Sequence, residues 1–213
     1  MTSAAPFRVF LLSPADCSGR RAQILQRPTA LHDLGRRLHG EEGAPLGEVF
    51  AFVSSLYFRG KLAYARAFAR PPGGAPGIHV ITPCDGLRAP DDIVRPRDLR
   101  RYAGVDVCAE EARYRRPLLR HLEALAPAWA ETEVVLLGSI ASAKYVDVLT
   151  SILGERVLFP SDFVGRGDMS RGGLMLRCVE EGRELAYSPI VGAVRHGPRP
   201  ARLPPARPRR LEG

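Results

Sequence analysis

The sequence predicts an α/β fold: a single domain with a central, mostly parallel sheet flanked by helices. Three short apolar runs have the length of buried strands, Phe7 to Leu12, Ile78 to Thr82 and Val134 to Leu137. The segments between them place apolar residues at helical spacing. The third run continues through Gly138-Ser139 into a helix, which is the beginning of a β-α-β unit. Strands that alternate with helices in this way are typical of α/β proteins.

The remaining elements follow from periodicity and from turn-forming residues. Gly60 is expected to interrupt the long helix in which it lies, since glycine is a poor helix former. The glycine-rich segment from Val164 to Gly173 is expected to be a polar loop. Helices are expected from about Arg20, around His32 to Leu38, and over 46–70, 109–125 and 141–153, with a further strand over 157–159.

Two regions with different composition divide the 213-residue chain. Residues 1–194 are long enough to bury a full hydrophobic core and are expected to form the α/β domain. Residues 195–213 contain six arginines and five prolines, and proline removes the backbone donors that helices and strands need. We expect this tail to be a disordered or polyproline-like arm, which either binds nucleic acid non-specifically or acts as a solubilising extension.

The formal charge of +8 comes almost entirely from arginine. Only Lys61 and Lys144 are lysines, so 29 of the 31 basic residues are arginine. The excess has two explanations, codon usage in a GC-rich genome or contact with phosphate groups, which suit the planar guanidinium. The sequence does not choose between them.

The cysteines, Cys17, Cys84, Cys108 and Cys178, have no C-x-x-C spacing that would favour a zinc site. We therefore expect no metal, and no dinucleotide motif indicates a cofactor. No apolar run is long enough to span a membrane, and FRVFLL is too short for a signal peptide. These features favour a cytoplasmic protein with reduced thiols and no membrane partner.

The first candidate site follows the first strand. Asp16, Cys17, Ser18 and Arg21 lie where a strand leads into a helix, a position at which backbone N–H groups favour an anion. The helix end and nearby arginines would lower the pKa of Cys17. The alternative is a capped turn, with Ser18 as the N-cap residue.

Two further candidates follow the second and third strands. Asp85 is placed for a general base or a hydrogen-bond acceptor, or else forms a simple Asp-Gly turn. Ser139 and Lys144 lie in a strand-turn-helix context suited to phosphate or nucleobase contact, although no Walker, S-x-x-K or G-x-S-x-G motif is present. Lys144 could instead extend over the helix surface.

The fourth candidate is the glycine-rich segment. Arg166 and Arg171 could bind a phosphate or carboxylate bidentately, with the glycines allowing close backbone approach. The alternative is a flexible surface loop.

Four short segments together resemble the YaaA peroxide-stress family. They are Ser13 to Ala15, Thr82 to Pro90, Ser142 to Tyr145 and Arg166 to Arg171, in the order of the family's Ser-Pro-Ala, Gly-x-Leu-Arg-Pro, Glu-Tyr and Arg-Gly-x-Met-Ser-Arg segments. The family's lysine after Ser-Pro-Ala is Asp16 here, and the Asp-Glu before the tyrosine is Ala143-Lys144. The resemblance implies an α/β fold and an association with DNA and protection against peroxide.

A second set of segments is similar to uncharacterised bacterial domains related to the uracil-DNA-glycosylase-like domain of archaeosine synthase. The matching residues are Cys17-Ser18-x-x-Arg21, Leu56 to Ala65 and Ile81 to Ile93. Those domains have lysine where Arg21 stands. The resemblance implies a link to nucleic acids.

These observations favour a nucleic-acid-associated protein that binds DNA or tRNA or acts on a nucleotide or base, and they leave open whether it is an enzyme. Asp16, Cys17 and Asp85 are then the candidate catalytic residues. One alternative is a non-enzymatic DNA-binding stress protein, and another is an enzyme with a small anionic substrate. The sequence leaves the oligomeric state open. The residues expected to contact phosphate or nucleic acid are Ser18, Arg21, Ser139, Lys144, Arg166 and Arg171.

Overall fold

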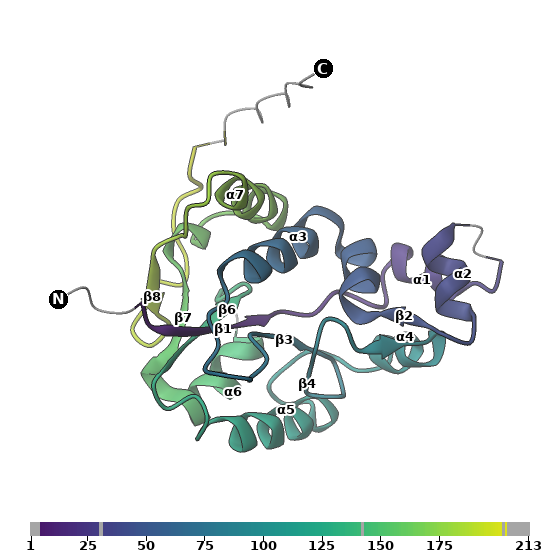
Figure 1. Ribbon diagram of the computed structural model, residues 1–213, viewed down its shortest axis with the longest axis horizontal. Coiled ribbons are helices and arrows are strands. Elements are labelled where there is room, and N and C mark those ends of the chain that lie inside the picture. The colour runs from purple at the N-terminus through teal and green to yellow at the C-terminus, as the bar shows by residue number, and fades with distance from the viewer. Residues whose placement is uncertain (1–4, 30–31, 142, 202, 204–213) are drawn as a thin grey trace.

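A six-stranded sheet forms the centre of the molecule (Figure 1). The computed structural model describes residues 5–29, 32–141, 143–201 and 203. The strands of the sheet are β1 Phe7–Leu12, β3 Ile78–Ile81, β4 Leu87–Arg88, β6 Thr132–Leu137, β7 Val157–Pro160 and β8 Tyr187–Pro189. Their order is β4-β3-β1-β6-β7-β8, with the four inner strands parallel and the two edge strands antiparallel. The predicted α/β class with a mostly parallel sheet is confirmed.

Strand β1 lies at the middle of the sheet and contributes to both faces. Phe10 and Leu12 belong to one hydrophobic cluster, whereas Val9 and Leu11 belong to the other. All four side chains are fully buried. Because both faces are covered, the strand is a continuous apolar run rather than an alternating one, which is why it is recognisable in the sequence.

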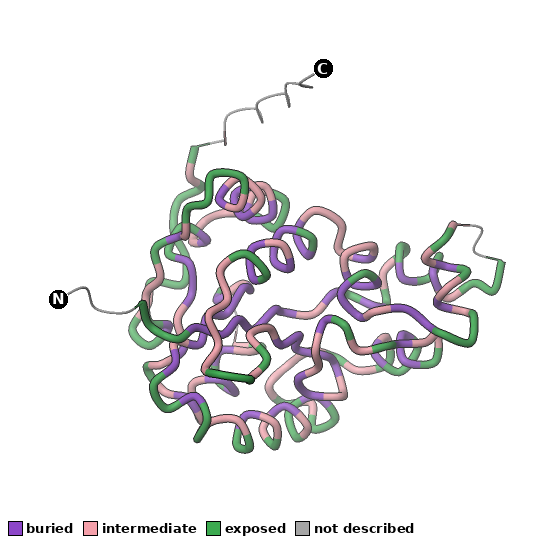
Figure 2. Tube along the Cα trace, in the orientation of Figure 1, coloured by how far each residue is buried: buried purple, intermediate pink, exposed green. Residues whose placement is uncertain are grey.

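Helices cover the sheet on both sides (Figure 1). Helix α3 (Leu46–Phe68) and helix α7 (Asp168–Glu180) lie on one face, and α5 (Ala112–Leu125) and α6 (Ala143–Leu153) lie on the other. Buried and exposed residues alternate along these helices, while the inner strands are mostly buried (Figure 2). The short 3-10 helices η1 (Gly154–Arg156) and η2 (Ser161–Phe163) flank β7.

A small lobe extends from one end of the sheet. It contains α1 (Arg20–Gln26), α2 (Asp33–His39), α4 (Pro96–Ala103) and a two-stranded sheet of β2 (Ala44–Pro45) and β5 (Ile93–Val94). Its buried side chains, Leu25, Leu38 and Leu99 among them, belong to the same hydrophobic cluster as Phe10 and Leu12. The lobe and the sheet therefore share one core, and the chain forms a single domain.

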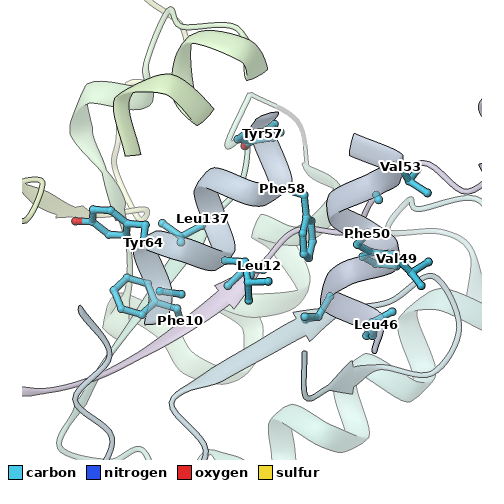
Figure 3. Close-up of a cluster of buried hydrophobic side chains, with 14 of the residues drawn as sticks. Phe10, Leu12, Leu46, Val49, Phe50, Val53, Tyr57, Phe58, Tyr64 and Leu137 are labelled. Atoms are coloured by element: carbon cyan, nitrogen blue, oxygen red, sulfur yellow. The ribbon is translucent and has the colours of Figure 1, made fainter. Parts of the chain in front are cut away.

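The long helix α3 bends at Ser55 and not at Gly60, where the sequence predicts an interruption. Ser55 has φ 51° and ψ −129°, which are not helical values. Figure 3 shows the two parts of α3 running in different directions, with Phe50 on one part and Phe58 on the other. At Gly60 the helix continues without a break. The missing side chain of Gly60 instead leaves space for the neighbouring helix α7.

The glycine-rich segment is largely helical, so the prediction of a polar loop over Val164 to Gly173 is wrong from Asp168 onwards. Helix α7 begins at Asp168 and includes both Gly172 and Gly173. A side chain at Gly172 would place its Cβ 2.6 Å from the carbonyl oxygen of Leu56 in α3. Close packing between the two helices therefore requires the glycine that makes the sequence look like a loop, and tertiary contact outweighs helix propensity.

The beginning of the predicted C-terminal arm packs against the α/β domain at Leu203. Residues 195–201 and 203 contain no helix or strand, and Leu203 packs against the hydrophobic cluster under α3 and α7. The rest of the predicted arm, residues 202 and 204–213, lies outside the described residues, so its expected disorder stays a prediction.

Candidate functional site

A cavity of about 370 Å³ opens at the carboxyl ends of the parallel strands. Its walls come from the segments that follow β1, β3 and β6, from the bend of α3, from residues 102–107 and from the start of α6 and α7. Strand β1 pairs with β3 on one side and with β6 on the other. The order in which strands are added to the sheet therefore changes side at β1. Open α/β sheets bind their ligands at such a switch point.

A buried lysine lies directly beneath the floor of this cavity. The Lys61 side chain, from α3, is completely buried. Its Nζ donates hydrogen bonds to the carbonyl oxygen of Ser13 (2.6 Å) and to the Ser13 Oγ (2.9 Å). The rings of Tyr57 and Phe58 lie 4.4 and 4.7 Å from Nζ. Ser13 and Tyr57 both line the cavity, so these two residues separate the ammonium group from it.

The surroundings of Lys61 favour its neutral form. Within the described part of the chain no carboxylate forms an ion pair with it. Burial lowers the pKa of Lys61 to about 7; the Asp168 carboxylate opposes this shift and the Arg171 guanidinium adds to it. Because burying an unpaired ammonium is costly, such a lysine is typical of functional sites rather than of ordinary cores.

Ser13 is held by the end of strand β6. Its N–H donates to the carbonyl oxygen of Leu137 in β6 at 3.2 Å. A Cβ at Gly138 would lie 3.0 Å from the Ser13 Cβ, so glycine leaves the space that the serine side chain occupies. The Tyr145 hydroxyl interacts with the Ser13 side chain, and burial raises the pKa of Tyr145 to about 12. The hydroxyl of Tyr145 therefore stays protonated at neutral pH.

The predicted residues Asp16, Ser18, Ser139 and Lys144 meet at the cavity. The Asp16 carboxylate accepts hydrogen bonds from the Ser18 N–H (2.9 Å) and the Ser18 hydroxyl (2.6 Å). The Ser18 hydroxyl is the main cause of a lowered Asp16 pKa, and the Lys144 ammonium lowers it further. Asp16 is therefore an exposed, ionised carboxylate at the mouth of the cavity.

Cys17 also lines the cavity, but its chemistry is opposite to the prediction. The side chain is buried, and this burial raises the pKa of the Cys17 thiol to about 12. Helix α1 begins only at Arg20, and the Arg21 guanidinium turns away to the carbonyl oxygen of Phe52 (2.6 Å). The loss of water around the thiolate raises the pKa of Cys17 by more than the helix end could lower it, so Cys17 is not an activated nucleophile. Arg21 does not line the cavity either.

Asp85 does not line the cavity. Its carboxylate accepts a hydrogen bond from the Tyr102 hydroxyl at 2.8 Å and forms an ion pair with Arg101. The Asp85 N–H donates to the Thr82 Oγ1 at 3.0 Å. Asp85 thus stabilises the turn after β3 and the position of α4. Of the two predicted roles, this arrangement favours a turn-forming residue over a general base.

Arg166 and Arg171 lie outside the cavity as well. Arg166 donates to the carbonyl oxygen of Asp162 at 2.9 Å. The buried Arg171 donates twice to the carbonyl oxygen of Phe163 (3.2 and 3.1 Å) and forms an ion pair with Asp168 at 3.2 Å. Both guanidinium groups hold the turn that precedes α7, so they are not placed to bind a phosphate in the cavity.

Several residues that shape the site are not among the predicted ones. Lys61 and Tyr57 come from α3, and Lys61 is 48 positions away from Ser13. Asp106 and Asp168 come from two further segments. One signal was present for Lys61: it is one of only two lysines in the chain and lies in the middle of a largely apolar helix. The others carry no local signal, since their meeting depends on the fold.

The described ranges contain neither a metal-binding cluster nor a membrane-spanning helix. No group of three His, Cys, Asp or Glu side chains there could hold a metal ion. None of the helices in these ranges has both the length and the apolar character that spanning a membrane requires. All four cysteines are free.

Comparisons with known proteins add no relatives. No protein-family model matches the chain, and searches of curated proteins and of solved structures found no match.

Proposed function

We propose that the protein is an enzyme that binds a nucleobase, alone or as part of a nucleotide or nucleic acid, in the cavity at the carboxyl ends of β1, β3 and β6. The volume of about 370 Å³ lies within the range of small-molecule sites. Enzymes that act on bases of nucleic acids accommodate a flipped-out base in a pocket of this kind. The two resemblances noted in the sequence agree with this ligand class.

The charge of the cavity wall carries the proposal. Three carboxylates line it, Asp16, Asp106 and Asp168, against one ammonium group, Lys144. Asp168 is paired with Arg171, so the excess negative charge comes from Asp16 and Asp106. A phosphate group inside would meet this excess negative charge, whereas a base is uncharged and offers N–H donors to carboxylate oxygens. We therefore expect the base inside and any phosphate at the rim, next to Lys144.

The aromatic lining provides a second argument. Tyr57 and Tyr102 both line the cavity. The Tyr57 hydroxyl is buried and has no partner at hydrogen-bonding geometry within the described chain. The Arg171 guanidinium interacts with this hydroxyl, and the flat rings of the two tyrosines suit a planar base. The Asp16 carboxylate, being ionised, would bind an N–H of the base or orient a water molecule.

The experiment uses the full chain and a panel of free bases and nucleosides, with binding measured by isothermal titration calorimetry. We expect at least one to bind and Asp16→Asn to weaken it about tenfold, a loss of about 1.4 kcal/mol. Asp147→Asn is the matched control, since Asp147 is exposed on α6 outside the cavity. If no base or nucleoside binds at millimolar concentration, or if both variants bind equally well, the proposal is wrong.

A second candidate, non-enzymatic binding of DNA or tRNA, is favoured by the outer face of α5. Arg115, Arg116 and Arg120 are exposed there, and none has a carboxylate partner among the described residues. Such a surface suits a phosphate backbone. Replacing the three by glutamine should lower the salt dependence of nucleic-acid binding, measured by fluorescence anisotropy. An unchanged salt dependence would exclude this face, while Asp16→Asn should leave such binding intact.

A further inference from the structure

We infer that Ser13 and Lys61 form a nucleophile–base pair at the floor of the cavity, and that its substrates carry a reactive acyl carbon, such as that of an ester or activated amide. The Nζ of Lys61 lies 2.9 Å from the Oγ of Ser13, within the range of catalytic nucleophile–base pairs. This inference concerns the reaction and does not depend on the ligand being a nucleobase.

Lys61 has the surroundings of a general base. Its side chain is fully buried. The groups that face it are Ser13 from the loop after β1, Tyr57 and Phe58 from its own helix, and Asp168 and Arg171 from α7. The lowered pKa of about 7 means that a neutral amine is available near neutral pH. One N–H can stay on the Ser13 carbonyl oxygen while the lone pair accepts the Ser13 hydroxyl proton.

Ser13 has access to a ligand although little of it is exposed. It is 3 % exposed, and that surface lies on the cavity. The residue is fixed by its backbone bond to Leu137, so its hydroxyl is held in place before a ligand binds. Tyr145 lines the cavity and its hydroxyl interacts with the Ser13 side chain, so this hydroxyl is a candidate donor to negative charge that develops on a substrate oxygen next to Ser13.

The chemical step balances with water as the only co-reactant. The Ser13 Oγ forms a bond to the acyl carbon while its proton passes to the Lys61 Nζ. The bond from the acyl carbon to the leaving group breaks, and the leaving group takes that proton. Water then attacks the acyl–serine, its proton passes to Lys61, and Ser13 regains a proton as the Oγ–carbon bond breaks.

If the role of Lys61 is purely structural, a different reactivity of Ser13 is expected. In that role the lysine joins α3 to the end of β1 through the carbonyl oxygen of Ser13, and the hydroxyl is no more reactive than that of an ordinary serine. The reactivity of Ser13 therefore separates the two roles.

The experiment treats the full chain with a fluorophosphonate probe, which forms an Oγ–phosphorus bond with activated serines and releases fluoride. We expect labelling at Ser13, located by peptide mass spectrometry and lost in Ser13→Ala. Ser151→Ala is the matched control, because Ser151 lies on α6 outside the cavity and should leave labelling unchanged. Absence of labelling, or labelling at another serine only, would overturn the inference.

Two measurements test the lysine. Lys61→Met, with its fold checked by circular dichroism, should slow labelling of Ser13 by about 100-fold or more. In the unmodified chain the labelling rate should rise with pH and level off above a pKa of about 7. A folded variant with an unchanged rate overturns the pair, and so does a flat pH profile. The second measurement decides the matter if the variant does not fold.

Discussion

Gly60 and Gly172 bring the backbones of α3 and α7 into direct contact. A Cβ at Gly60 would lie 2.6 Å from the carbonyl oxygen of Gly172, and one at Gly172 equally close to that of Leu56. This contact fixes α3 against the helix that carries Arg171 and begins at Asp168. The position of Lys61, next to Gly60, depends on it directly.

Gly60→Ala should therefore destabilise the fold by about 1–3 kcal/mol, because backbone atoms cannot move aside as a flexible side chain can. Urea unfolding followed by circular dichroism measures the change. Gly73→Ala is the matched control, since a Cβ there meets nothing within 4 Å. The control should stay within about 0.5 kcal/mol of the parent. Equal stability of the two variants would contradict the proposed contact.

The free energy of unfolding should depend on pH through Lys61. Its pKa falls from about 10.5 in the unfolded chain to about 7 in the folded protein. The unfolded chain thus binds more protons between these values, and stability rises with pH across this window. Relative to Lys61→Met, the parent should gain up to about 1.4 kcal/mol per pH unit from pH 7 to 10, measured by urea unfolding. A constant difference between the two proteins would show that Lys61 titrates normally.

Cys17 should be unreactive in the native state. Burial raises the pKa of its thiol to about 12, so little thiolate exists at pH 8. With iodoacetamide, the half-buried Cys108 should be alkylated well before Cys17, as followed by peptide mass spectrometry. Faster modification of Cys17 than of Cys108 would restore the interpretation of Cys17 as an activated thiol. In urea both residues should react at similar rates.

Removing one hydroxyl should change the titration of Asp16. Ser18→Ala deletes the hydrogen bond that contributes most to the low pKa of Asp16, so this pKa should rise. Carboxyl carbon chemical shifts followed by NMR against pH measure it directly. Ser161→Ala is the control, because its hydroxyl faces Ser188 and not Asp16. An unchanged Asp16 titration in Ser18→Ala would show that the bond does not persist in solution.

The four inner strands were predictable because burial on both faces leaves a continuous apolar run, and Phe7–Leu12 matches the predicted bounds. The short edge strands β4 and β8 were not predicted. The start of helix α7 could not be predicted, because Gly172 allows close packing against α3. The local sequence pattern gives no sign of this contact. The loops after β1 and β6 could be placed at the site, since parallel strands end at one edge of a sheet. Arg166 and Arg171 could not be excluded as phosphate ligands from the sequence. Only the fold shows that their guanidinium groups donate to backbone carbonyl oxygens. Lys61 could not be linked to Ser13 for the same reason.

The bend at Ser55 has a consequence for how the cavity can change its width. Ser54 and Tyr57 both line the cavity and lie on opposite sides of this residue. The half of α3 before Ser55 belongs with the lobe, and the half after it packs on the sheet and on α7. A rotation about the two backbone bonds of Ser55 would move one wall of the cavity relative to the other while both helical halves stay intact. Ser55 is thus the point of α3 about which the two parts of this wall would change their angle, and its positive φ is a strained conformation for a serine.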